Sequence, residues 1–351
     1  MQRQAAAGFR LGLILLVGWA LVPFVAMSAG PDRFDSAMGR GLEGLAGSFD
    51  GERFADPYLN FVYEKEQLPV VNGHRVTYRI LDAYFMVLML EEAGVAPGPA
   101  SLLYKRAGEV TDTLAPIWKN SGIYNLAERP HPGGVALDTY AILAFLKRDR
   151  AMAEVVKAAL HRDRWLPADY YREPESYRHP ADESWALRAI LHTELDSEVC
   201  DRIARRLVAE TRALLDEASD PVARVILVFH MLEMLRELPG ETSTATGAFL
   251  EEAVQLIGLP GDQLDTLTTA NLLATAAQED AIPIDSLHPL TERLLNAQRS
   301  TGLWHVESDD DSEDGSVFTT LRCVLALKQY VDRLDRQGRA AARTRLVSGS
   351  R

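Results

Sequence analysis

An apolar helical segment with a small, polar or acidic opening recurs six times along this chain, about every 40–55 residues. A period of this size indicates repeated supersecondary units. Amphipathic helical segments with charge on one face separate the copies. The six copies are LDAYFMVLML (from Leu81), LDTYAILAFL (from Leu137), DESWALRAIL (from Asp182), PVARVILVFH (from Pro221), LTTANLLATA (from Leu267) and FTTLRCVLAL (from Phe318).

The recurring segments are more apolar on all sides than the helices between them. A helix that is apolar all round belongs in the interior of a protein. We therefore predict an all-α fold, an (α/α)6 toroid in which the six recurring helices form an inner ring and the six others an outer ring. Strand signals are nearly absent, and the only β-like stretch begins at Gly73.

The N-terminus has the pattern of an export signal. Arg3 and Arg10 precede the apolar run Leu11–Met27. Positive residues before an apolar stretch are typical of a secretory signal peptide or a membrane anchor. We predict that residues 1–30 are one of these two, so that the body of the protein lies in the periplasm or outside the cell. The sequence does not decide between cleavage and anchoring.

Composition divides the remainder into three regions. Gly, Ser and Asp enrichment predicts a linker over 31–51, the repeats form the toroid domain over 52–334, and a basic flexible tail follows over 335–351.

The two cysteines, Cys200 and Cys323, lie within apolar helical patterns, so they are either buried thiols or a disulfide. The formal net charge of −13 argues against nucleic-acid binding.

Acids and aromatic rings gather at the openings of the first three recurring helices. One set of helix ends lines the mouth of an α/α ring, so these side chains are candidates for a ligand site. Asp138, Asp182 and Glu183 are the candidate catalytic carboxylates, since a carboxylate pair can transfer protons in glycan cleavage. Helix capping is the alternative role for each. The candidate ligand-binding residues are Asp82, Tyr84, Tyr140, Trp185 and Arg188. Arginines on these helices either bind an anionic ligand or pair with acids inside the protein.

The last repeat contains a motif that resembles a known family. Gln298, Gly302 and Trp304 have the spacing Q-x3-G-x-W before an apolar helix. This resembles the QW repeat of the squalene-cyclase and protein-prenyltransferase superfamily, which has an α/α-toroid fold. The resemblance implies that Gln298 ties helix ends together and that Trp304 stacks beneath them. The Asp-x-Asp-Asp motif of the cyclases and the zinc ligands of the prenyltransferases are not matched.

An acidic loop precedes the last recurring helix. Asp310, Ser312 and Asp314 match the opening of a calcium-binding EF-hand loop, but Leu321 stands where the closing Glu is expected. These residues are candidate calcium ligands, and a solvated acidic loop is the alternative. No other cofactor is predicted.

Together these patterns predict an exported or membrane-anchored toroid that binds an extended ligand in its central cavity. A glycan cleaved by hydrolysis or lyase chemistry is the leading hypothesis. A non-catalytic binding or assembly module of an envelope complex, with a protein partner, is one alternative. A protein that binds or cyclises an isoprenoid is the other. Whether the protein is an enzyme stays open.

Overall fold

A computed structural model describes most of the C-terminal half of the chain and one N-terminal helix. The longer described ranges are 31–48, 197–238, 243–305 and 316–348. Shorter described pieces are 70–71, 74–75, 86–87, 89–91, 93–95, 101, 104–105, 184 and 187–188.

The described part of the chain is predominantly α-helical, as predicted. Its strands are β1 (Val70–Val71) and β2 (His74–Arg75), which pair antiparallel. The α-helices are α1 (Pro31–Ser48), α8 (Ser197–Glu217), α9 (Pro221–Glu237), α10 (Ser243–Ile257), α11 (Thr266–Ala276), α12 (His288–Ala297) and α13 (Val317–Ser348). Two short 3-10 helices, η4 (Gly261–Gln263) and η5 (Ile284–Leu287), lead into α11 and α12.

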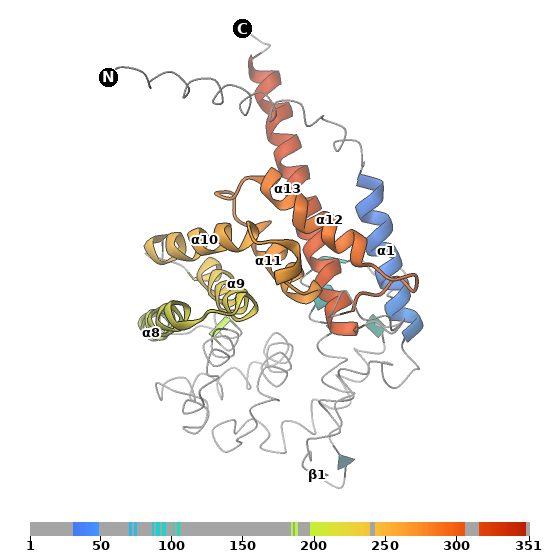
Figure 1. Cartoon of the computed structure of the whole chain (residues 1–351). Coiled ribbons are helices and arrows are strands. Elements are labelled where there is room, and N and C mark those ends of the chain that lie inside the picture. The colour runs from blue at the N-terminus through green and yellow to red at the C-terminus, as the bar shows by residue number, and fades with distance from the viewer. Residues whose placement is uncertain are drawn as a thin grey trace, which may run out of the picture.

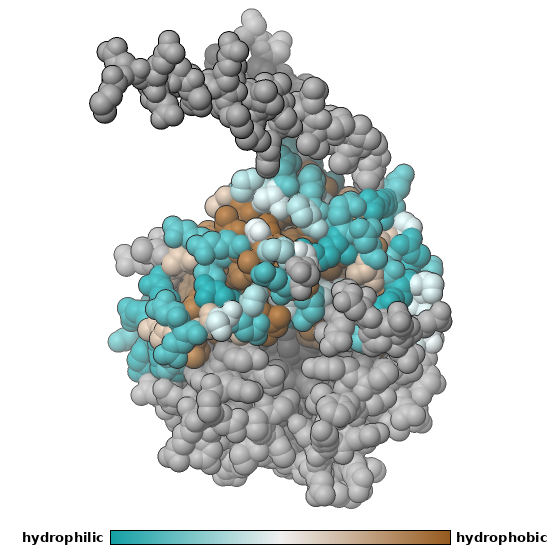
Figure 2. Space-filling view, viewed as in Figure 1, coloured by the Kyte–Doolittle hydropathy of each residue, from teal (hydrophilic) through white to brown (hydrophobic). Residues whose placement is uncertain are grey.

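The helices lie in two layers. The inner layer contains α9, α11 and the first half of α13, which follow one another as neighbours (Figure 1). On the outer layer, α8 packs on α9, α10 packs on α9 and α11, and α12 packs on α11. In the space-filling view, hydrophobic residues show in the middle of the described part, and hydrophilic residues surround them (Figure 2).

Three of the six recurring segments lie in this inner layer. The segments that begin at Leu267 and Phe318 are buried along most of their length, and the segment at Pro221 has no exposed residue, whereas α8, α10 and α12 each expose one face. Met86, Met89 and Leu90 of the first segment and Leu187 of the third are also buried and join the same hydrophobic core. The interior position predicted from their apolarity is therefore confirmed for the described residues.

Each described inner helix begins at a side-chain cap. Asp220, Asp265 and Ser316 accept hydrogen bonds from backbone N–H groups of the first turns of α9, α11 and α13, at 2.6–3.3 Å. These groups would otherwise have no partner, because the first turn of a helix leaves its N–H groups unsatisfied. The caps fix where each inner helix starts, and so set the register of the residues that face the interior.

The linker predicted over 31–51 is wrong for residues 31–48, which form α1. Phe34, Met38, Leu42 and Leu45 are buried, and their helical spacing forms one apolar face that packs against α13. The four glycines of the segment suggested a flexible linker. In the helix, however, small residues allow the close approach of α1 to its neighbours.

The loop after α12 fastens α1 to the core. The side-chain amide of Gln298 donates to the backbone oxygens of Ala37 in α1 and Gly302, at 2.8 and 2.9 Å. The indole of Trp304 is fully buried and donates to the backbone oxygen of Leu294 at 2.7 Å. Gln298 thus joins the end of α12 to α1, and Trp304 binds the loop to α12 from within the core.

The C-terminal tail predicted over 335–351 is helical through Ser348, because α13 continues without a break past the end of the last repeat. Side chains 335–339 on this continuation are exposed. None of the helices in the described ranges is both long and apolar enough to cross a membrane.

The two cysteines are buried thiols that are not joined to each other. Burial, with a smaller contribution from the carboxylate of Asp265, raises the pKa of the Cys323 thiol well above its ordinary value. Of the two alternatives that the sequence left open, the structure has the buried thiols.

Candidate functional site

Among the predicted site residues, Arg188 is the one that the structure describes. The others lie outside the described residues, so the convergence expected of them stays a prediction. They are Asp82, Tyr84, Asp138, Tyr140, Asp182, Glu183, Trp185, Asp310, Ser312 and Asp314.

Arg188 occupies a position that other repeats fill with an aliphatic side chain. Aligning the recurring segments puts it in register with Val87, Leu227, Leu273 and Val324, which are all buried. The Arg188 side chain is itself only 11% exposed. A guanidinium at a core position must be paired with acids or hydrogen-bond acceptors, because burying an isolated charge is costly.

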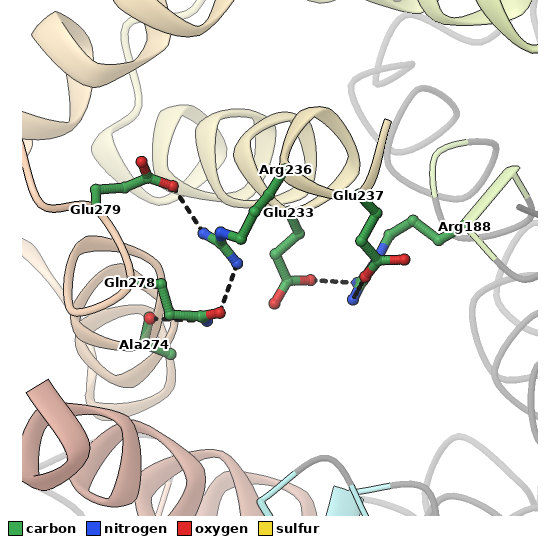
Figure 3. A network of polar contacts seen from close by, with 7 residues as sticks. All are labelled: Arg188, Glu233, Arg236, Glu237, Ala274, Gln278 and Glu279. Atoms are coloured by element: carbon green, nitrogen blue, oxygen red, sulfur yellow. Dashed lines mark hydrogen bonds and ion pairs between the residues drawn. The ribbon is translucent and has the colours of Figure 1, made fainter. Parts of the chain in front are cut away.

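Two glutamates of α9 supply this pairing. Glu233 accepts from Nη1 of Arg188 at 2.6 Å, and Glu237 accepts from Nε at 2.7 Å (Figure 3). The Glu233 side chain is 5% exposed and that of Glu237 is 28% exposed. Of the two roles predicted for Arg188, pairing inside the protein is therefore observed. It joins the third recurring helix to the fourth.

A second arginine carries this charged cluster on to α11. Arg236 of α9 donates to the side-chain oxygen of Gln278 at 2.7 Å and to a carboxylate oxygen of Glu279 at 2.9 Å (Figure 3). Gln278 in turn donates to the backbone oxygen of Ala274 at 3.2 Å. Guanidinium and carboxylate groups thus connect three consecutive repeats, at the C-terminal ends of α9 and α11.

Two positive charges surround His230, one turn before the glutamates on α9. Burial lowers the pKa of His230 well below its ordinary value, and the guanidinium groups of Arg322 and Arg188 lower it further. The imidazole is therefore neutral at pH 7. A neutral imidazole can accept a hydrogen bond or a proton, whereas an imidazolium can only donate.

Arg322 shows that helices two repeats apart meet in the interior. Its guanidinium carbon lies 5.0 Å from the ring centre of Phe229 and 5.6 Å from that of Phe318. Phe229 belongs to α9, whereas Arg322 belongs to α13, and α11 packs against both of these helices. The side chain thus reaches past the neighbouring inner helix, so the faces of α9 and α13 that bear these residues share one interior region.

Helices α11 and α13 also carry a set of buried side-chain oxygens. The side-chain oxygens of Asn271 and Thr275 on α11, and of Thr319 and Gln329 on α13, are buried without a hydrogen-bond partner among the described residues. We call these four residues the polar strip. Asn271 has the same repeat position as Arg322. Thr275 lies four residues after Asn271, so these two share a face of α11. Thr319 lies three residues before Arg322 and Gln329 lies seven after it, so these share a face of α13 with Arg322.

The sequence contained signals for these residues that composition alone did not reveal. Glu233, Arg236 and Glu237 interrupt an apolar helix, and Asn271 lies within a segment otherwise made of Leu, Ala and Thr. Polar residues on a helix that is buried all round are the exception that points to a site. Among the described residues, no group of three or more His, Cys, Asp or Glu side chains could hold a metal ion.

No protein-family model matches the chain, and no curated protein matches it either. The described residues offer two arrangements of polar side chains, the charged cluster and the polar strip.

Proposed function

We propose that this protein is an (α/α)6 toroid whose interior binds a hydroxyl-rich ligand, namely a segment of a glycan. The observation that carries the proposal is the polar strip. A buried acceptor left without a hydrogen bond costs about 1–3 kcal/mol, and several such atoms on one surface call for an explanation. Sugar hydroxyls supply the O–H donors that these oxygens lack.

The alternative ligands fit this surface less well. An isoprenoid chain has no hydrogen-bond donors, so it would leave Asn271 and Thr275 unsatisfied. The charged cluster contains two arginines and three glutamates, which offer both donors and acceptors. Hydroxyl groups use both kinds of partner, because each can donate and accept.

The repeat register supports a functional role for the candidate acids. In the sequence alignment of the repeats, Asp138 and Glu183 correspond to Thr268 and Thr319, and Thr319 belongs to the polar strip. The described repeats cap their inner helices with a residue one or two positions before the recurring segment, as Asp265 does for α11. Capping therefore does not by itself account for an acid at the later position.

On this basis we assign the chemistry to the openings of the first three recurring helices. Asp138 and Asp182 would transfer protons in hydrolysis or elimination of a glycosidic bond, with Glu183 in support. Asp82 would bind hydroxyls, and the rings of Tyr84, Tyr140 and Trp185 would stack on sugar faces.

Two further features support the ring and its location. The packing of α1 against α13 resembles that of α10 on the inner helices, and it suits an outer helix that closes a ring between the last repeat and the first. The basic and apolar N-terminus supports export, which would bring the protein to glycans outside the cytoplasm.

The test measures binding and cleavage by the full chain. Neutral and uronate-containing oligosaccharides are titrated calorimetrically, and cleavage is followed by new reducing ends or by absorbance of an unsaturated product. Asp138→Asn and Asp182→Asn should retain the wild-type unfolding free energy yet lose cleavage, because an amide cannot transfer the proton.

Asp265→Asn is the matched control. Asp265 caps α11 in the structure, and Asn caps about as well as Asp, so both stability and binding should be unchanged. Wild-type protein that binds no oligosaccharide of the panel would overturn the proposal. Full cleavage by both test variants would return Asp138 and Asp182 to a capping role.

A further inference from the structure

The C-terminal part of α13 extends well beyond the packed body. Among the described side chains of this helix, Arg333 is the last that is buried, and α13 continues to Ser348. At 1.5 Å per residue, the helix beyond Leu334 is about 21 Å long. Side chains 335–339, where this extension starts, are all exposed.

This extension has a charge opposite to that of the whole protein. Residues 335–351 include five arginines and one aspartate, in a chain whose formal net charge is −13. Arg336 and Arg339 are exposed and lie three residues apart, which places them on one face of the helix. The extension is therefore a cationic arm on an anionic body.

The arm leaves the body beside the start of α1. The rings of Phe34 and Tyr330 are in edge contact, with centres 5.5 Å apart, and Gly41 lies against Val324. The two helices are thus antiparallel, so Pro31 lies at the end where the arm departs (Figure 1). Pro31 follows the apolar run Leu11–Met27 by only a few residues.

We propose that the arm, residues 335–351, binds the anionic phospholipid headgroups of the membrane from which α1 emerges. This rests on the proposed N-terminal membrane segment, and adds a second, electrostatic contact at the same end of the molecule. Each arginine near an anionic bilayer strengthens binding about five-fold. An acidic body would be repelled by such a surface, so a basic arm beside the attachment point offsets that repulsion.

A single fluorophore on the arm can report this contact. Gly338→Cys provides the attachment point, since its side chain would meet no neighbouring atom within 4 Å and both native cysteines are buried. The labelled full chain is reconstituted in nanodiscs of phosphatidylcholine, with or without about one third phosphatidylglycerol. A headgroup-attached quencher should quench the label more strongly in the anionic discs, and high salt should reverse the effect.

Charge variants separate a specific arm from general attraction. Arg336→Gln with Arg339→Gln should lower the ratio of bound to unbound arm about thirty-fold. The matched pair Arg202→Gln with Arg205→Gln, which removes two exposed charges from α8, should leave the quenching unchanged. Equal quenching in neutral and anionic discs would overturn the proposal.

Failure of the N-terminal anchor would give a different result. The chain would then stay outside the nanodiscs, and the same variants would be tested by co-sedimentation with anionic vesicles. Sedimentation that is lost in the Arg336→Gln, Arg339→Gln variant would still support the arm as a lipid-binding element. No sedimentation, or tighter binding to an RNA oligonucleotide than to the vesicles, would reject it.

Discussion

The four glycines of α1 allow a direct test of how this helix packs. A Cβ atom added at Gly39 or Gly47 would meet no other atom within 4 Å. At Gly41 it would lie 2.8 Å from the Trp304 ring, and at Gly44 it would lie 2.6 Å from the backbone oxygen of Thr301. Gly39 and Gly47 should therefore tolerate alanine, whereas Gly41 and Gly44 should not.

The expected magnitudes follow from two opposing effects. Alanine is better than glycine in a helix by up to about 1 kcal/mol, so Gly39→Ala should raise the free energy of unfolding by roughly this amount. Gly47→Ala should give less, because it lies in the last turn. At Gly41 and Gly44 overpacking opposes the gain by about 1–3 kcal/mol. Gly44→Ala should be the more harmful, since its neighbour is backbone and cannot rotate away.

The assay is urea unfolding of the four full-length variants, followed by circular dichroism and tryptophan fluorescence. We expect the two classes to differ by about 1–3 kcal/mol at an unchanged m-value. Equal changes at all four positions would mean that α1 does not pack against the loop before α13. The segment would then be the linker that its composition suggests.

Three further predictions concern the charged cluster, a buried tyrosine and a helix cap. Arg188→Leu should lower the unfolding free energy by about 3–5 kcal/mol, because it leaves the buried Glu233 carboxylate without its partner. The double variant Arg188→Leu, Glu233→Leu should recover much of this loss, because aliphatic groups replace the whole pair. Denaturant titration measures the unfolding free energy of the two variants. Burial raises the pKa of Tyr330 to about 12. The folded protein thus keeps a proton that the unfolded chain releases near pH 10, so stability should fall as the pH rises between about 10 and 12. Tyr330→Phe should remove this fall in a pH series. Asp265→Ala should lower the free energy of unfolding by about 1 kcal/mol, which thermal melting detects as a lower melting temperature. Asp265→Asn should leave the melting temperature unchanged.

The sequence predicted the inner helices well because their signal is local and strong. PVARVILVFH and LTTANLLATA together contain one charged residue, Arg224, and the interior accommodates helices of this kind. The failure at α1 has a physical cause as well. Phe34, Met38 and Leu45 do have helical spacing, but glycines lower helix propensity, and only the partner surface explains why they are needed.

The site was less accessible to sequence reasoning. Acids at helix openings are visible in the sequence, whereas the pairing of Arg188 with Glu233 depends on which helices are neighbours. The unsatisfied oxygen of Asn271 is a property of packing, because the same residue on an exposed helix would bind water. The repeat register connects the acids seen in the sequence with the residues seen in the structure, since it assigns each position of one recurring helix an equivalent position in the next.

The central claim is that the polar strip serves a ligand and not the fold. The most direct test measures unfolding free energy and oligosaccharide binding on the same preparations of the Asn271→Leu, Thr275→Val variant. Replacing buried oxygens that lack partners by apolar groups should keep or raise stability, while binding should weaken about ten-fold or more. Thr211→Val, which removes a similar oxygen from α8, should keep or raise stability and leave binding unchanged. Wild-type binding by the Asn271→Leu, Thr275→Val variant would contradict the account.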